Sequence, residues 1–297
     1  MHIANPIYDV VFKYLMEDNK IAKQIVSLII REEVLELTFS PQEHTTRGER
    51  TLTVYRIDFM AKIATPNGSK VVMIEMQKAK LYADILRFRR YLGGRYRDKE
   101  STFVDEKNIH RPLEIYCIFF LGHSLGYSSS PVIRIHYGLI DDATEEKLSL
   151  LPDDDFIPSL HHRSWIIQIP HLKQHRRNVL EQLLSVFDQD NITSNDHILN
   201  IREEDVPAAY RPIIRRLQQA AESPQVQDEM DMEDDYFEEF RARERNKEEV
   251  IEEQAKALEE KDKALKETTK ALEEKDKEIE ALKHRLKTKD NQNTKYL

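Results

Sequence analysis

Between residues 51 and 80, apolar and polar residues alternate in TVYRIDFMAKI before Asn67-Gly68, and a Val/Ile/Met-rich run, KVVMIEM, follows it. Strict alternation is typical of a strand with one buried face, and Asn-Gly is the dipeptide most typical of a two-residue hairpin turn. We therefore predict two antiparallel strands joined at Asn67-Gly68. The rest of the fold is expected to be built around this hairpin.

Elsewhere the spacing of apolar residues changes from strand-like to helical. Short apolar runs without charges predict strands, whereas apolar residues three and four apart predict amphipathic helices. The longest strand-like run, EIYCIFFL, is apolar throughout and is expected in the middle of a sheet buried on both faces. Strands are predicted near 34–40, 113–122, 132–140 and 164–170, two short helices within 6–31, a basic helix from 83, and a helical C-terminal subdomain over 173–222.

The hairpin concentrates polar chemistry on one face. If Asn67 and Gly68 form the loop, Pro66 pairs with Ser69 and Asp58 lies opposite Gln77. Side chains two apart on a strand share a face, so Asp58, Glu75 and Gln77 converge there, and the other face is apolar. Two interpretations fit. These residues form a site for a hard cation such as Mg²⁺, or they are the solvated face of an exposed hairpin.

Beyond Ser223 the composition changes. Residues 223–245 are predicted to be an acidic linker, and 246–297 a long charged helix with an apolar residue every seventh position from Ile251. The column four residues further on is polar after Ala255, with Asp262, Thr269 and Asp276, so the coiled coil is weak and self-association through this helix is at most marginal. The remaining residues, 1–222, are expected to form the main domain.

Composition limits the classes of protein. The chain of 297 residues is 40% hydrophobic, which is enough for a sizeable core. No run of 18 apolar residues occurs and the amino terminus lacks a signal-peptide pattern, so we expect a cytoplasmic protein without a membrane partner. Cys117 is the single cysteine, which excludes an internal disulfide and a cysteine-rich zinc site.

Charge is unevenly distributed. The formal net charge is −9, which argues against non-specific coating of nucleic acid, but residues 87–99 hold six basic residues and one acidic residue. Within this basic helix, Arg87 and Arg90 project from a stripe of Ile85, Phe88 and Leu92. The two interpretations are an ordinary solvated face and a clamp on the DNA backbone, because guanidinium groups bind phosphate in bidentate fashion.

Three further patterns carry residues with potential chemistry. Gly122-His123-Ser124-Leu125-Gly126 matches the G-x-S-x-G motif of acyl hydrolases, but no helical pattern follows it, so we predict a loop. His171 and His175 are four residues apart without the glutamate of a zinc-protease helix, which makes a zinc site a minor alternative. Asp9 is predicted to pair with Lys13 four residues later, or else to be an additional site carboxylate together with Glu43.

The ordered set of motifs resembles one family. Asn5 to Lys13 (NPIYDVVFK), Arg56 to Phe59 (RIDF), Glu75 to Lys78 (EMQK) and Arg87 to Leu92 (RFRRYL) together resemble the PD-(D/E)XK nuclease family transposases, also called recombination-promoting nucleases or putative transposases. The likeness extends over roughly residues 1 to 240. The residue before Asp58 is Ile57 where many members have proline, and Gln77 stands where the usual catalytic residue is lysine.

This resemblance implies a fold and an activity. The expected fold is α/β, a restriction-endonuclease-like mixed sheet flanked by helices, followed by the helical subdomain and the charged helical tail. The expected activity is metal-dependent hydrolysis of DNA phosphodiester bonds, associated with mobile elements or recombination. Asp58 and Glu75 would bind Mg²⁺, with Mn²⁺ as a substitute, and Gln77 would complete the catalytic set.

An alternative follows from Gln77. An amide cannot act as an acid or a base, and it brings no positive charge to the reacting phosphate. Lys78 is adjacent but points to the other face of a regular strand, so it could replace the missing lysine only through a bulge. The alternative is therefore a catalytically inactive DNA-binding protein that retains the nuclease fold.

Overall fold

The computed structural model of the chain describes residues 1–39, 59–66, 68–77, 82–104, 108–126, 128–149, 156–173 and 175–293. The chain divides into two compact units, Met1–Glu233 and Asp234–Leu297. The sheet, the cores and the candidate sites discussed below all belong to the first unit.

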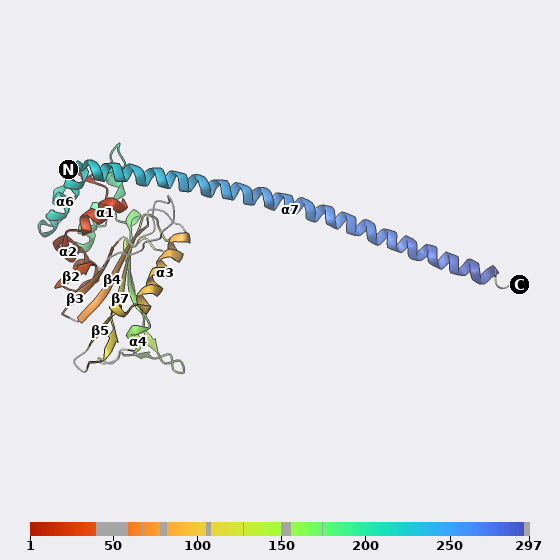
Figure 1. Cartoon of the computed structure of the whole chain (residues 1–297), viewed down its shortest axis with the longest axis horizontal. Coiled ribbons are helices and arrows are strands. Elements are labelled where there is room, and N and C mark those ends of the chain that lie inside the picture. The colour runs from red at the N-terminus through yellow and green to blue at the C-terminus, as the bar shows by residue number, and fades with distance from the viewer. Residues whose placement is uncertain are drawn as a thin grey trace. The chain divides into compact units, whose positions relative to one another are not determined.

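The first unit is built on a mixed six-stranded sheet with the strand order β2-β3-β4-β7-β11-β8 (Figure 1). The strands β2, β3 and β4 form an antiparallel meander, β4, β7 and β11 are mutually parallel, and β8 returns antiparallel at the edge. The predicted α/β class and its mixed sheet are confirmed. The strands are β2 (Glu36–Phe39), β3 (Phe59–Thr65), β4 (Gly68–Gln77), β7 (Glu114–Leu121), β8 (Val132–Ile135) and β11 (His162–Gln168).

Three small antiparallel pairs accompany this sheet. The pair of β1 and β12 joins the amino terminus to the C-terminal part of the unit, and the other two pairs are short hairpins. Their strands are β1 (His2–Ala4), β12 (Ile198–Asn200), β5 (Thr102–Val104), β6 (His110–Pro112), β9 (Leu139–Ile140) and β10 (Lys147–Leu148).

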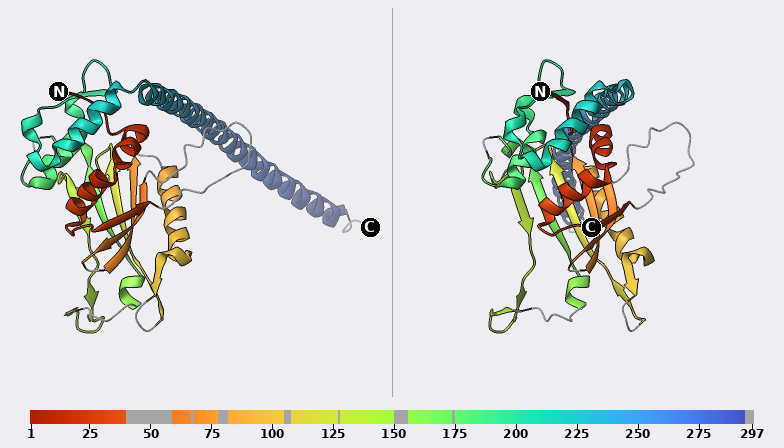
Figure 2. Two further views of the ribbon diagram at one scale, coloured as in Figure 1. Left: turned by 60° about the vertical axis from the view of Figure 1, so that its left-hand side comes forward. Right: turned by 90° about the vertical axis from the view of Figure 1, so that its left-hand side faces the viewer.

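Helices cover both faces of the sheet. Figure 2 shows α1 and α2 on one face and α3 on the other. The two short helices predicted within 6–31 are confirmed. The second has Asp18 as its N-cap, whose carboxylate accepts hydrogen bonds from the backbone N–H groups of Lys20 and Ile21. The helices are α1 (Asp9–Met16), α2 (Asn19–Ile30), α3 (Tyr82–Arg97), α4 (Phe156–Ser159), α5 (Val179–Leu184), α6 (Arg211–Glu222) and α7 (Pro224–Asn293).

Two apolar cores lie on opposite faces. The larger core joins α1, α2, α5 and α6 to one face of the sheet, through residues such as Phe12, Ile74 and Phe120. The smaller core lies beneath α3 and contains Met73, Phe88 and Cys117 among others. The strand β7 contributes to both cores, which confirms its predicted central position, and burial raises the pKa of the Cys117 thiol to about 12.

The hairpin register differs from the predicted one. Thr65 pairs with Gly68 and Phe59 with Ile74, so the paired residue numbers sum to 133 and the loop starts at Pro66, one residue earlier than expected. Proline favours the second position of a turn and glycine the fourth, and Gly68 has a φ of 104°, which L-residues rarely adopt. Because the shift is two residues, each side chain keeps its predicted face.

The basic helix also departs from prediction in detail. α3 begins at Tyr82, one residue before the predicted start at 83. The helix continues through Gly93 and Gly94 without a break. Ile85 is 47% exposed, which removes it from the predicted buried stripe, whereas Phe88 is buried.

The C-terminal helix α7 runs without interruption through both the predicted acidic linker and the predicted charged helix. Its predicted apolar column is exposed on the single chain: Leu258, Leu265 and Leu272 are 63%, 64% and 64% accessible. Most of the charged side chains that are described along it are also exposed, and pairs such as Lys263 with Glu259 span one turn.

Candidate active site

Glu75 and Gln77 lie in the second half of β4, and both are buried. Glu75 is 0% exposed and Gln77 is 7% exposed. They share a face with Met73, which belongs to the smaller core under α3. On the neighbouring parallel strand, Phe119 pairs with Glu75. The alternative that these two side chains form the solvated face of an exposed hairpin is therefore wrong.

The other residues of the predicted set are only partly described. Asp58, Glu43 and Lys78 lie outside the described residues, as does Asn67 of the hairpin. The predicted pairing of Asp58 with Gln77 rested on the register that the structure replaces. Within the described residues, the candidate site consists of Glu75, Gln77 and the apolar side chains around them.

The helix α3 covers this face of the sheet. The ring of Phe88 meets the ring of Phe119 edge to face, with 4.5 Å between centroids, which holds the helix against β7 beside Glu75. Arg90 is exposed, as predicted, and Arg89 beside it is exposed too. The side chain of Arg87 lies outside the described part of the helix.

Asp9 forms the predicted ion pair with Lys13 within α1. Its backbone N–H also donates to the Glu233 carboxylate at 2.9 Å. α1 packs into the larger core, on the sheet face opposite Glu75. Asp9 thus has a local partner and does not lie beside Glu75 on β4.

Metal-binding chemistry is limited in the described residues. They contain no group of three or more His, Cys, Asp or Glu side chains placed to hold a metal ion. The histidines considered for zinc have other partners: Nε2 of His171 lies 2.8 Å from Oγ of Ser124, and Nδ1 of His175 lies 3.1 Å from the Lys173 carbonyl. A carboxylate and an amide on β4 are oxygen donors of the kind that Mg²⁺ prefers, so Glu75 and Gln77 fit that ion as part of a site.

The G-x-S-x-G segment is a loop, as predicted. The described residues that follow it, 128–149, hold strands and turns, so a nucleophile elbow is not formed there. Gln168 is fully buried and fixes this loop: its Oε1 accepts from the Leu125 N–H at 2.8 Å, and its Nε2 donates to the Ser128 and Ser130 carbonyls. The contact between Ser124 and His171 was not expected from the sequence.

A partly buried charge network on the opposite face was not predicted from the sequence either. The Lys70 ammonium is 5% exposed and lies 3.1 Å from the Glu114 carboxylate and 3.7 Å from that of Glu32. Arg163 contacts the other oxygen of Glu114 at 3.2 Å, and the Tyr116 hydroxyl lies 3.1 Å from both carboxylates. Burial, and then the neighbouring Glu114, raise the pKa of Tyr116, so its hydroxyl stays protonated and can donate.

A cavity of 470 Å³ lies at the carboxyl end of α3. Tyr96, Tyr137, His161 and His162 line it, and the rings of Tyr137 and His161 are stacked with centroids 4.6 Å apart. His162 is level with Ile115 on β7, four residues before Phe119, which places it about 13 Å from the Glu75 level along the strands. This cavity is therefore separate from the candidate active site.

Comparison with known proteins adds no assignment. No family model matches the chain, and no curated protein or solved structure shows a significant match to it. Among the described residues, no helix is both long enough and apolar enough to cross a membrane.

Proposed function

We propose that this protein is a metal-dependent DNA endonuclease of the PD-(D/E)XK type, with a restriction-endonuclease-like fold. The observation that carries the proposal is the complete burial of Glu75 in an apolar face of the sheet. An ionised carboxylate buried this deeply is stable only with compensating partners, and a bound cation would add to the contact that Glu75 already makes within the chain. Carboxylates in such surroundings are concentrated at functional sites.

The order of elements supports the fold assignment. A helical N-terminal segment, α1 and α2, precedes the antiparallel meander of β2, β3 and β4, and α3 then leads to β7, which is parallel to β4. A restriction-endonuclease-like core has this succession of helix, meander, helix and parallel strand. The site of such a core lies on the hairpin that β3 and β4 form here.

The second proposed ligand is Asp58. It directly precedes Phe59 in the sequence. Phe59 pairs with Ile74, the neighbour of Glu75. Asp58 and Glu75 would hold Mg²⁺, which supplies an activated water for attack on the phosphodiester. The Gln77 amide would orient the water or the phosphate by hydrogen bonds.

The basic surface of α3 is the proposed path for the DNA backbone. Phe88 anchors this helix over the candidate site, and Arg90 is exposed on it. Arg87 and Arg90 would bind phosphate oxygens, which fixes the register of the duplex without reading its sequence. The proposed association with mobile elements or recombination follows only from the resemblance of the motifs.

The alternative is a catalytically inactive DNA-binding protein with the same fold. Gln77 favours it, since an amide supplies neither a proton nor a positive charge to the reaction. Both candidates predict binding of DNA, and they differ only in turnover.

Cleavage of supercoiled plasmid separates the two. Purified protein would be incubated with plasmid and Mg²⁺ or Mn²⁺, beside Asp58→Ala, Glu75→Gln and the matched control Glu181→Gln, which alters a glutamate of similar burial. If the protein is an endonuclease, the wild type and the control variant should nick the plasmid, and both site variants should fail to do so. Cleavage by both Asp58→Ala and Glu75→Gln would contradict the assignment of the site. Binding of DNA by the wild type without cleavage would favour the alternative.

A further inference from the structure

A recess of 310 Å³ lies beside the edge strand β8, where the end of α2 and the start of α5 meet the sheet. Small-molecule sites are commonly concavities of about 300 Å³ or more, so this volume is at the lower end of that range. The recess is lined by Ile29, Arg31, Val132, Arg134, Trp165, Arg177, Asn178, Leu180 and Glu181.

Positive charge dominates the polar part of this lining. Three guanidinium groups face one carboxylate, and that carboxylate is already bound: Nε and Nη2 of Arg177 donate to Glu181 at 2.9 and 2.6 Å. Burial raises the pKa of Glu181, but the hydrogen bonds from Arg177 outweigh this and lower the pKa overall, so the pair is ionised at neutral pH. Arg31 and Arg134 have no ion pair within the described residues.

The backbone at Arg31 is unusual for an arginine. This residue ends α2 in the left-handed conformation, with φ of 60° and ψ of 34°. Glycine and asparagine are the residues that favour this position, and a side chain with a Cβ costs about 1 kcal/mol or more there. Local backbone stability therefore does not explain why this position holds an arginine. A requirement for positive charge in the recess would explain it.

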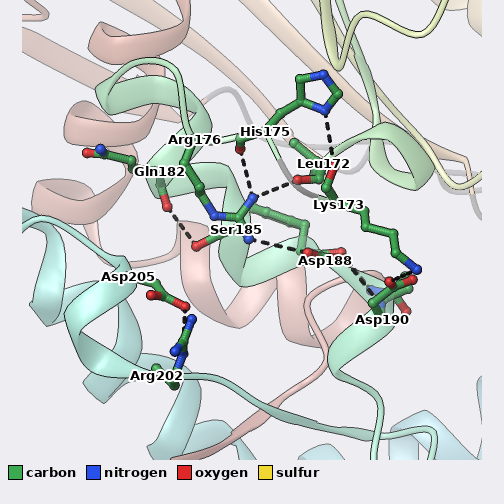
Figure 3. A network of polar contacts seen from close by, with 12 residues as sticks. Leu172, Lys173, His175, Arg176, Gln182, Ser185, Asp188, Asp190, Arg202 and Asp205 are labelled. Atoms are coloured by element: carbon green, nitrogen blue, oxygen red, sulfur yellow. Dashed lines mark hydrogen bonds and ion pairs between the residues drawn. The ribbon is translucent and has the colours of Figure 1, made fainter.

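The remaining walls are apolar and well supported. Arg134 pairs with Trp165 across the strands β8 and β11, so their side chains project from the same face of the sheet at neighbouring positions. The segment that carries Arg177 is held by Arg176, whose guanidinium donates to the carbonyls of Leu172 and His175 and contacts the Asp188 carboxylate at 3.3 Å (Figure 3). The recess is thus preformed, which lowers the entropic cost of binding.

From these features we infer that the recess is a binding site for a small organic phosphate, a molecule that joins a phosphate group to a compact apolar or aromatic body. Arg31 and Arg134 supply the compensating charge, the Asn178 amide adds N–H donors, and Trp165 with Ile29 and Leu180 contacts the apolar body. The site lies against the larger core, on the sheet face opposite Glu75, so this assignment is independent of the proposed nuclease.

Trp165 is the single tryptophan of the chain and lines the recess, so its fluorescence reports directly on occupancy. The full-length protein would be titrated with phenyl phosphate, and the same titration would be followed by calorimetry. Phenol tests the contribution of the phosphate group, and inorganic phosphate tests that of the apolar body. We expect binding of phenyl phosphate that is tighter than binding of either fragment.

Two variants test the arginines. Arg134→Gln removes one charge, and Arg31→Asn removes the other while retaining a residue that tolerates the left-handed conformation. Loss of one charge-assisted hydrogen bond should weaken phenyl phosphate about tenfold or more in each variant. Arg31→Asn should also keep or raise the melting temperature, which distinguishes a lost contact from a damaged fold. The control Arg215→Gln, at an exposed arginine of α6, should bind normally.

Several results would overturn the assignment. A dissociation constant for phenyl phosphate weaker than about 1 mM in both measurements would do so. Equal affinity for phenol and phenyl phosphate, or unchanged affinity in both arginine variants, would show that the guanidinium groups do not bind the ligand. Displacement of phenyl phosphate by short duplex DNA, with the same sensitivity to Arg31→Asn and Arg134→Gln, would place the recess on the DNA path instead.

Discussion

The hydroxyl oxygen of Tyr96 lies 3.1 Å from Nδ1 of His162, which joins the last turn of α3 to the first residue of β11. Burial, and then the nearby Cys117, raise the pKa of Tyr96, so its hydroxyl carries a proton at neutral pH. Burial, and then His161, lower the pKa of His162. A neutral imidazole with its proton on Nε2 accepts the Tyr96 hydroxyl proton at Nδ1, whereas the other tautomer donates from Nδ1 to the hydroxyl oxygen.

This relationship predicts a pH dependence of stability. Because the pKa of His162 is lower in the folded state than the ordinary value of 6.5, the unfolded chain binds more protons between those two values. The stability that depends on neutral His162 is present above pH 6.5 and is lost as the pH falls through the folded pKa. Urea unfolding over this range should show less pH dependence for His162→Gln than for the wild type. The exposed His110→Gln is the control, and an unchanged profile for His162→Gln would contradict the prediction.

The basic surface of α3 predicts a salt effect. If Arg90 contacts a phosphate, Arg90→Ala should reduce the slope of log affinity against log salt concentration on duplex DNA by about 0.9, because one fewer counterion is released. The loss should be similar for all sequences, since backbone contacts do not read bases. Arg87→Ala should behave alike. Arg243→Ala, at an exposed position in α7, should leave the slope unchanged. Unchanged slopes for both α3 variants would place the DNA elsewhere.

The two glycines inside α3 predict stabilising substitutions. A Cβ at Gly93 or Gly94 would meet no atom within 4 Å, and both residues are helical. Each change to alanine should therefore raise the free energy of unfolding by about 0.5 to 1 kcal/mol, because it lowers the entropy of the unfolded chain. Chemical denaturation measures this. Gly68→Ala is the matched control and should destabilise, since its φ is 104°. Destabilisation by both α3 substitutions would be the contrary result.

The amide of Asn5 predicts a large stability effect. Asn5 is 1% exposed, and its Nδ2 donates to Oε1 of Gln189 and to the Asp196 carbonyl, both at 2.9 Å. Its Oδ1 accepts from Gln189 Nε2 and from the Ile7 N–H. Asn5→Ala removes these four hydrogen bonds and leaves the buried Ile7 N–H without this acceptor, so it should cost about 2 kcal/mol or more.

A drop in the melting temperature of about 5 °C is the expected readout for Asn5→Ala in a unit of this size. Gln225→Ala, which removes an exposed pair with Glu229, should change it little. If the two variants melt at the same temperature, the Asn5 contacts do not stabilise the fold as proposed. The result bears on the NPIYDVVFK segment, because it assigns Asn5 a structural role that its sequence context did not indicate.

Local patterns in the sequence correctly predicted which elements form. Alternation and apolar runs predicted β4, β7 and β11, and helical spacing predicted α1 and α2, because the period of apolar residues directly reflects which face is buried. The same pattern identified Glu75 and Gln77 as neighbours on one face. The turn was misplaced by one position, since Pro66 and Gly68 compete with Asn67-Gly68 as turn signals and only the complete ladder decides between them.

The burial of Glu75 required the tertiary structure. The residue pattern of a strand does not say whether its polar face is exposed to solvent or covered by another element. Here α3, from a later part of the chain, covers the face that carries Glu75, and its Phe88 packs against Phe119 of β7. The ion pairs of Lys70 likewise depend on the parallel alignment of β4 with β7, which sets it beside Glu114. The recess at Arg31 combines segments more than 100 residues apart. The sequence by itself determined the elements and their faces. Only the packing of distant segments decided which polar groups share a site, because the short-range period of apolar residues does not specify which element covers which face.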